Sequence, residues 1–478
     1  MTRQQIDVMN VRDGLNMKET LHIYYTSDLH SHFENWPKIV YFLKEKIHQH
    51  ERKQELYLIL DNGDHLDRVQ PISEASKGLG NVTLLNEAKY DVVTFGNNEG
   101  ITLDRDEFYH LYDDAKFSVV CANVVSQDGD NPAWLKRYVI KDVTPDFKVG
   151  IIGLTAPFNH FYHPMGWDAL DPLKQLKLTL TELTPQVDSI IVLSHLGVDQ
   201  DELIAKYFDE VDLIIGGHTH HLFKEGKQIN NSILSAVGKF GHYVGQASLT
   251  YDTDKRAVIE KTAHALPIDT LEVDSATEML LDTLGEQASR TMSDVVCTLP
   301  APLKVDWFKD TPIIQSLTET LKSWTGADLA MLNAGIILES LPKGDVTLHD
   351  LHRICPHPIN PAVVEITGRE LQEVIREGLT ERYIHYPVVG YGFRGKVMGV
   401  LVYDGVEIEL KEADRHEPLI RSIYINQKLL DPNKTYTLAT ADMFTFGHLA
   451  PNIAHASKKT YFMPEFMRDL LKISLETA

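Results

Sequence analysis

The sequence Gly216-Gly217-His218-Thr219-His220 carries two histidines on a turn. It directly follows residues 211–215, an apolar and β-branched run typical of a buried strand. The two glycines allow the chain to turn sharply where that strand ends. The stretch therefore predicts two imidazoles aimed at one point from the carboxyl end of a strand, which is an arrangement suited to binding a metal ion.

The same arrangement recurs upstream, where apolar strands end in Asp, Asn or His. A single polar residue after a strand is usually a turn former or a helix cap. Here five such ends follow in order, and every one supplies a nitrogen or oxygen donor, which indicates one shared metal site. The four upstream motifs are Asp28-Leu29-His30, Asp61-Asn62-Gly63-Asp64, Gly96-Asn97-Asn98-Glu99 and Ser194-His195.

These motifs resemble those of the calcineurin-like metallophosphoesterases, whose pattern is D-x-H, G-D, G-N-H-[DE], a lone His, and G-H-x-H. The more specific resemblance is to the 5'-nucleotidase and 2',3'-cyclic phosphodiesterase members. It implies a four-layer α/β/β/α sandwich that binds two divalent metal ions. Two such ions can activate a water molecule for hydrolysis of a phosphate ester. The resemblance assigns Asp28, His30, Asp64 and His220 to one ion, and Asp64, Asn97, His195 and His218 to the other.

In this assignment Asp64 bridges the two ions. Imidazole and carboxylate ligands without thiolate suit Mn, Zn, Fe or Co, so the sequence leaves the metal open.

Two residues depart from the family pattern at catalytic positions. Asn98 replaces the histidine that steadies the transition state and protonates the leaving oxygen, and Ile101 replaces the aspartate that orients it. An amide donates hydrogen bonds but delivers no proton near pH 7, so about 10² to 10⁴ of general-acid assistance is predicted to be missing. We therefore predict that Asn98 contacts the phosphate and that catalysis depends mainly on the metals held by Asp64.

The length of 478 residues predicts more than one domain. Alternating strands and amphipathic helices predict a catalytic α/β domain over residues 20–270, a linker helix over 271–294 and a second, smaller α/β domain over 295–478. The polar residues 1–19 are predicted to be a disordered extension.

The second domain resembles the C-terminal domain of 5'-nucleotidases and is predicted to close over the metals and bind the substrate. The family's two base-stacking aromatics align with His357 and Met443, and its ribose and phosphate contacts align with apolar residues. Lys309 occupies the position of another phosphate-binding arginine. The predicted substrate contacts are Lys309, Asn333, His357, Phe393, Arg394 and Lys396.

The composition limits the partners. A net charge of −22, from 46 basic and 68 acidic residues, argues against binding nucleic-acid polymers or anionic membranes. The three cysteines are far apart, and the sequence contains neither a signal-like segment at its start nor a run of roughly 18 apolar residues. We therefore expect a cytoplasmic enzyme for a small phosphate ester. The oligomeric state stays open.

Three functions remain in contention. The first is hydrolysis of nucleotides, including 2',3'-cyclic ones. The second is a phosphatase or pyrophosphatase for a different metabolite, which the lost base and ribose contacts favour. The third is a metal-binding sensor with little turnover, which Asn98 favours and the complete ligand set opposes.

Overall fold

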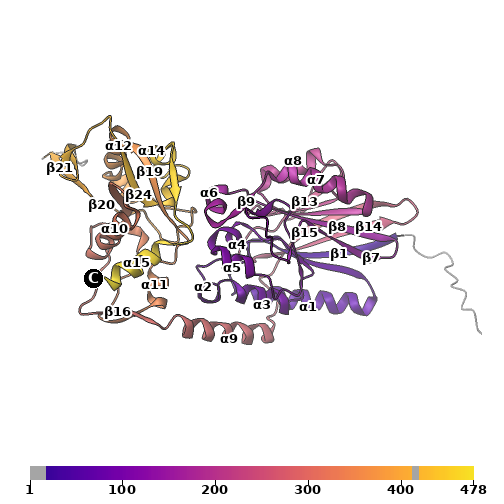
Figure 1. Ribbon diagram of the computed structural model, residues 1–478. Helices are drawn as coiled ribbons and strands as arrows, with labels where there is room; N and C mark the ends of the chain where they lie inside the picture. Colours follow the sequence, from indigo (N-terminus) through magenta and orange to yellow (C-terminus); the bar gives the residue numbers. More distant parts are fainter. Residues whose placement is uncertain (1–17, 412–418, 478) are drawn as a thin grey trace, which may run out of the picture.

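The computed structural model describes residues 18–411 and 419–477, which form two α/β domains joined by a long helix (Figure 1). Lys18 and Glu19 begin the first strand, so they are not part of an extension; the rest of the predicted extension lies outside the described residues. Within the described ranges, no helix combines the length and the apolar character needed to cross a membrane.

Two large sheets form the centre of the first domain. One has the strand order β15 (Ala257–Pro267), β14 (Tyr243–Asp252), β1 (Lys18–Thr26), β2 (Leu56–Asp61), β3 (Val92–Val93), β4 (Ser118–Val120) and β6 (Leu135–Lys136). The other has the order β12 (Lys227–Ile229), β13 (Ser232–Ala236), β11 (Leu213–Gly216), β10 (Ser189–His195), β8 (Phe147–Thr155) and β7 (Tyr138–Thr144).

The central strands of both sheets run parallel, and the antiparallel strands lie toward the edges. β1 pairs in parallel with β2, and β10 pairs in parallel with β8 and β11. Parallel strands are normally covered on both faces, and β10 is buried along its whole length. The carboxyl ends of these strands therefore open at one edge of each sheet, and this is where the polar motifs follow.

The two sheets pack face to face, and helices cover their outer faces. Ile23 of β1 and Ile191 of β10 belong to the apolar cluster between the sheets. On the outer side of the first sheet, Trp36 and Leu43 of α1 belong to one apolar cluster with Tyr24 of β1. The domain is thus the predicted α/β/β/α sandwich. Its helices are α1 (Trp36–Lys53), α2 (Pro71–Ser76), α3 (Leu79–Glu87), α4 (Asn97–Thr102), α5 (Arg105–His110), α6 (Asn159–Tyr162), α7 (Pro172–Leu183) and α8 (Val198–Tyr207). β5 (Val124–Ser126) and β9 (Trp167–Ala169) form a separate antiparallel pair.

Helix α9 (Ser275–Thr291) runs from the first domain toward the second along one side of the molecule (Figure 1). It begins at the capping residue Asp274, whose carboxylate accepts a hydrogen bond from the Thr277 backbone N–H at 2.9 Å. Its position falls inside the linker range 271–294, while the domain boundaries near 270 and 295 stay predictions.

The second domain is built on one mixed sheet with its own core. The strand order is β20 (Leu401–Asp404), β17 (Leu329–Asn333), β24 (Thr435–Ala441), β19 (Pro361–Thr367) and β25 (Lys459–Tyr461). The surrounding helices are α10 (Pro312–Thr325), α11 (Leu348–Ile354), α12 (Gly368–Gly378), α13 (Glu381–Ile384), α14 (Pro451–Ala454) and α15 (Met467–Glu476). Two small sheets complete it: β16 (Val295–Leu299) with β18 (Gly344–Thr347), and β21 (Val406–Lys411), β22 (Leu419–Ile425) and β23 (Lys428–Leu429).

The domains meet through an ion pair network and an apolar cluster. Glu74 of α2 accepts two hydrogen bonds from Arg68 at 2.8 Å each and pairs with Arg468 of α15. The centroid of the Phe466 ring lies 4.6 Å from the guanidinium carbon of Arg68 and 4.7 Å from that of Arg468. The apolar cluster comprises Phe161, Ala362 and Tyr461, with Ile101, Phe446 and Met463 packed against it.

We expect the substitution Glu74→Ala to destabilise the protein by about 3 to 5 kcal/mol, because it leaves two buried guanidinium groups without their shared carboxylate. Burial opposes ionisation of Glu74, but Arg468 and Arg68 hold the pKa of this carboxyl well below its usual 4.5. A depressed pKa contributes stability that is present above pH 4.5 and is lost as the pH falls below it. Urea unfolding at pH 7 and at lower pH measures both effects.

The control is Glu286→Ala, which breaks an exposed pair with Arg290 on α9 and is expected to cost less than about 1 kcal/mol. Equal stability of the Glu74 and Glu286 variants at pH 7 would contradict a structural role for the interdomain network.

Candidate metal centre

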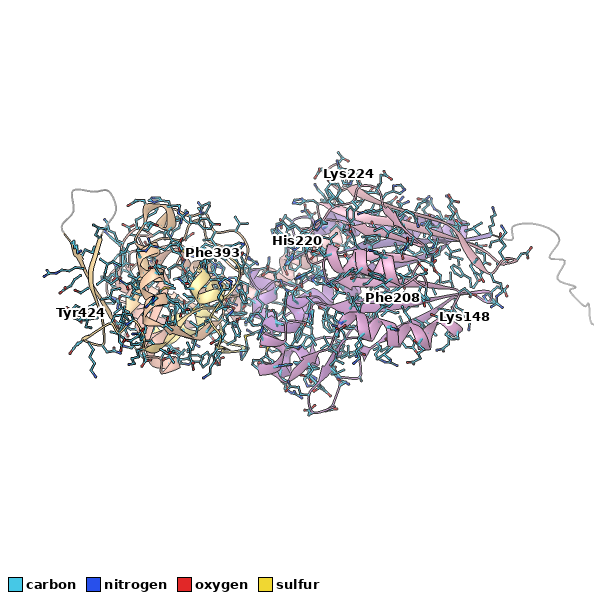
Figure 2. All side chains as sticks on the ribbon, turned by 90° about the horizontal axis from the view of Figure 1, so that it is seen from above. Lys148, Phe208, His220, Lys224, Phe393 and Tyr424 are labelled. Carbon is cyan, nitrogen blue, oxygen red and sulfur yellow. The ribbon has the colours of Figure 1, made fainter. Side chains whose placement is uncertain are left out.

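The predicted metal ligands gather where the strands of the two sheets end. Asp28 follows β1, Asp64 follows β2, Asn97 begins α4 after β3, and His195 is the last residue of β10. His218 and His220 follow β11, which pairs in parallel with β10. The structure thus brings all the predicted ligands together. Figure 2 shows His220 at the end of the first domain that faces the second.

Asp64 lies between histidines from both predicted sites. Its Oδ2 atom is 3.3 Å from His195 Nε2 and 3.7 Å from His30 Nε2. Asp28 Oδ1 is 3.5 Å from His220 Nε2 and 3.9 Å from His195 Nε2. The donors of Asp28, His30 and His220, and those of Asp28, Asp64 and His195, form two sets in which all atoms lie within 4.8 Å of one another.

A further pair of donors adjoins the second set. Asn97 Oδ1 is 2.8 Å from His218 Nδ1, so the two atoms can bind the same ion. Burial lowers the pKa of His218 to about 4 and that of His220 to about 3. Both rings are therefore neutral at neutral pH and can donate a lone pair to a cation.

The buried nitrogen of His195 shows that the centre is suited to a positive charge. Its Nδ1 donates to the Asn62 carbonyl at 2.8 Å, while its Nε2 faces the centre, 3.3 Å from Asp64 Oδ2 and without a well-aligned hydrogen bond among the described residues. Burial opposes protonation of this ring, yet Asp64 and Asp28 raise the pKa of His195 to about 10. Likewise, His30 Nε2 and His220 Nε2 face each other at 3.0 Å, an arrangement that a shared cation stabilises. The residues present therefore fit a divalent metal ion.

The backbone at the ligands is strained. A left-handed conformation is uncommon for residues other than glycine and costs of order 1 to 3 kcal/mol at each position. Backbone hydrogen bonds between the loops after β1 and β2 hold this geometry. They run from Asp28 N to the Gly63 carbonyl at 3.0 Å and from His30 N to the Asp64 carbonyl at 2.8 Å. The ligands with positive φ are Asp28 (53°), His30 (49°), Asp64 (49°), His218 (69°) and His220 (58°).

Two glycines are required because other groups approach their backbone closely. A Cβ atom on Gly96 would lie 2.2 Å from Asp64 Oδ1 and 2.6 Å from His195 Nε2. A Cβ atom on Gly217 would lie 2.9 Å from Asp28 Oδ2. Any side chain at either position would displace a predicted ligand.

Glu99 organises the turns around Asp64, a role that the sequence analysis missed. Its buried carboxylate accepts hydrogen bonds from the backbone N–H groups of Asp64 (3.1 Å), Leu66 (2.9 Å) and Gly96 (2.9 Å). The signal was its place three residues after Gly96, where it closes a capping box at the start of α4.

Asn98 lies beside the centre, but its side chain is already engaged. Its backbone N–H donates to Asp64 Oδ1 at 2.7 Å. Its Nδ2 donates to the Leu66 carbonyl at 3.0 Å and lies 3.0 Å from His30 Nδ1. Ile101, three residues on, packs against the interdomain apolar cluster.

Comparisons with known proteins agree with this geometry. The family Calcineurin-like phosphoesterase matches residues 21–222, and the family 5'-nucleotidase, C-terminal domain matches residues 292–449. The chain is 42% identical over 456 residues to the uncharacterized metallophosphoesterase YunD of Bacillus subtilis, covering 95% of this chain and 99% of that protein. The chain belongs to the calcineurin-like metallophosphoesterases.

This metallophosphoesterase also has more distant relatives. It is 22% identical to the 2',3'-cyclic-nucleotide 2'-phosphodiesterase/3'-nucleotidase of Salmonella typhimurium, over 89% of this chain and 81% of that protein. The structure of the Haemophilus influenzae NAD nucleotidase NadN superposes with a TM-score of 0.68 at 16% identity, covering 96% of each chain. The second likeness shows the two-domain fold.

As a member of this family, the protein is a metal-dependent hydrolase of phosphate esters, and the family uses a dinuclear centre of divalent ions. The strand-end residues described above are the groups of this metallophosphoesterase that could hold such a centre.

The predicted substrate residues of the second domain are arranged differently from the expectation. His357 is fully buried, and its ring stacks on Phe393 with centroids 5.0 Å apart. Its Nδ1 accepts from the Arg394 backbone N–H at 2.9 Å, so its Nε2 donates to the Ile336 carbonyl at 2.8 Å. In this arrangement His357 supports the loop that carries Phe393 and Arg394, and its ring is not presented to a ligand.

The other predicted contacts differ in burial and in the partners they bind. Asn333 is buried, and its Nδ2 donates to the Met398 carbonyl at 2.9 Å. Lys309 is 76% exposed and lies 3.5 Å from Asp306. Lys396 is exposed on the loop after Phe393. Arg394 extends from the same loop to Asp67 of the first domain, next to the metal centre.

Proposed function

We propose that this metallophosphoesterase hydrolyses phosphate esters of nucleotides, as a 5'-nucleotidase, a 2',3'-cyclic-nucleotide phosphodiesterase or both. The observation that carries the proposal is the convergence of imidazole, carboxylate and amide donors at the strand ends, with Asp64 between the two sets. The two-domain fold shared with NadN and the relationship to the Salmonella phosphodiesterase support a nucleotide as substrate.

Each predicted ligand has a proposed role. Asp28, His30, Asp64 and His220 hold one ion, and Asp64, Asn97, His195 and His218 hold the other. When bound, divalent ions supply Lewis-acid stabilisation of the phosphoryl oxygens and an activated water. Mn, Zn, Fe and Co all suit these ligands.

Protein groups set the orientation of these ligands. The Asn62 carbonyl fixes the tautomer of His195, and the Glu99 carboxylate fixes the turn that bears Asp64. The Asn98 backbone N–H orients the Asp64 carboxylate, and we propose that the Asn98 amide lies at the edge of the phosphate site. Exposed Lys309 and Lys396 are the proposed cations that meet the substrate from the second domain.

The proposal extends to where the enzyme works and what it acts on. We place it in the cytoplasm, in nucleotide catabolism, acting on small molecules. Three unpaired cysteines, Cys121, Cys297 and Cys355, and the strongly acidic composition support this setting.

The test is a substrate panel for the protein reconstituted separately with Mn²⁺, Zn²⁺, Fe²⁺ and Co²⁺. Nucleoside 5'-monophosphates, 2',3'-cyclic nucleotides, sugar phosphates and an aryl phosphate diester are compared by kcat/KM. We expect turnover that requires metal and is highest on one nucleotide class. Metal-bound protein that turns over none of these compounds would contradict the proposal and favour a sensor.

One observation favours a second candidate, a phosphatase or pyrophosphatase for a non-nucleotide metabolite. His357 and Met443, which align with the base-stacking aromatics of the family, are both fully buried. A sugar phosphate or a phosphoanhydride turned over faster than every nucleotide would support this candidate.

A further inference from the structure

Arg394 connects the second domain to a carboxylate beside the metal centre. Its Nη2 donates to Asp67 Oδ2 at 2.7 Å, and the Asp67 side chain is 3% exposed. The loop that presents Arg394 is anchored by the hydrogen bond from the Arg394 backbone N–H to His357 and by the stacking of Phe393 on the same ring. Docking of the second domain therefore places the Arg394 guanidinium against the buried Asp67 carboxylate of the first domain.

The same carboxylate oxygen faces a metal ligand. Asp67 Oδ2 is 3.7 Å from Nδ1 of His30, whose other nitrogen points into the centre. A histidine that binds a metal through Nε2 carries its proton on Nδ1 and needs an acceptor there. Asn98 Nδ2 also lies 3.0 Å from His30 Nδ1, but an amide nitrogen is a donor and cannot accept this proton. The carboxylate Oδ2 of Asp67 at 3.7 Å is the acceptor that a small shift would bring within hydrogen-bond distance.

Asp67 cannot turn away from this position without losing other bonds. Its Oδ1 accepts from the Val69 backbone N–H at 3.0 Å, and its own N–H donates to Ser31 Oγ at 2.8 Å. Its Oδ2 therefore stays between Arg394, at 2.7 Å, and His30, at 3.7 Å. A carboxylate that is paired with a guanidinium is a weaker acceptor for the imidazole N–H than one that is unpaired.

We propose that Arg394 is a positioning residue through which docking of the second domain adjusts the metal centre. By holding Asp67 Oδ2, which lies 3.7 Å from His30 Nδ1, Arg394 opposes the approach that would form a hydrogen bond between Asp67 and His30, so His30 donates less electron density to its ion. The ion is then bound less tightly and is a stronger Lewis acid. This inference rests on the proposed function, because it takes His30 as a metal ligand.

The test measures the dissociation constants of Mn²⁺ at fixed pH and salt, from the signal of free Mn²⁺ in electron paramagnetic resonance. Asp67→Asn should weaken one site by about 10- to 100-fold, as is typical when the partner of a metal-bound histidine is lost. Arg394→Gln should tighten the same site by about tenfold, because Asp67 then serves His30 alone and a nearby positive charge is gone. The double variant should match Asp67→Asn, since Arg394 acts through Asp67.

Two further variants separate this role from simple support of the fold. Arg394→Lys keeps the charge and should return the affinity toward that of the wild type. Arg382→Gln, which removes an arginine that is 82% exposed in the same domain, should leave both constants unchanged. Loss of packing alone would weaken or spare metal binding in Arg394→Gln and would not tighten it.

The outcomes are distinct. Wild-type protein that binds fewer than two Mn²⁺ ions would contradict the proposed function, and the inference would fail with it. Two bound ions with unchanged or weaker affinity in Arg394→Gln would overturn the inference and leave the function standing. Should Arg394→Gln not fold, Asp67→Asn decides, because unchanged affinity there would exclude Asp67 as the partner of His30.

Discussion

Asp64→Asn is expected to abolish hydrolysis of an activated aryl phosphate diester, with kcat/KM falling more than about 10³-fold. The reason is the position of Asp64 Oδ2 between His195 and His30, where a neutral amide cannot neutralise two cations. Bound metal should fall toward one ion or none per chain. Metal analysis of the purified variant, together with steady-state kinetics, gives both quantities.

Asp142→Asn is the matched control, because Asp142 is 71% exposed and forms a surface ion pair with Lys148. Both metal content and kcat/KM should stay at wild-type values in this control. Retention of two ions and normal turnover in Asp64→Asn would remove Asp64 as the bridging ligand.

The second large effect concerns the leaving group. Because Asn98 supplies no proton, the leaving oxygen departs with more negative charge, and the rate should depend steeply on the pKa of the leaving group. Aryl esters and phosphoanhydrides should react fast, and nucleoside 5'-monophosphates slowly. His65 does not replace the missing acid, since burial lowers its pKa to about 3. A plot of log kcat/KM against leaving-group pKa measures this dependence.

The double substitution Asn98→His with Ile101→Asp should flatten that plot by raising rates on alkyl monoesters up to about 10²- to 10⁴-fold. The Ile101→Asp change should also lower the stability of the protein, because Ile101 packs against the interdomain cluster with Phe161 and Phe446. Asn98→His with Ile101→Asn is therefore the control, since it loses the same packing without supplying the orienting carboxylate. Equal wild-type rates on nucleoside monophosphates and aryl esters would show that another group delivers the proton.

The sandwich fold and the gathering of the ligands were predictable because they follow local rules. An apolar strand followed by a glycine turn and a polar residue can be recognised in the sequence, and parallel strands bring such ends together. His195 and His218 were found in this way. The left-handed backbone at Asp28 and His30 was not, because it is imposed by hydrogen bonds to the neighbouring loop after β2 and leaves no local signature.

The second domain shows where sequence reasoning stops. His357 aligned with a stacking aromatic, yet it is buried and stacks on Phe393 of its own domain. Arg394 was predicted to bind substrate, but it pairs with Asp67, 327 positions away in the chain. Such pairings depend on how two separately folded cores dock, and neither local propensity nor spacing carries that information.

The scattering of the ligands along the chain has a consequence for how the enzyme acquires its metals during synthesis. Asp28 leaves the ribosome almost 200 residues before His220, and β1 then still waits for its antiparallel partner β14. A nascent chain thus holds isolated donors, each a poor chelator, until β11 and the turn after it have emerged. The full ligand set therefore exists only after synthesis has passed His220, when the chain has almost half of its 478 residues. Which metal the centre takes then depends on the divalent ions that are free in the surroundings at that stage of synthesis.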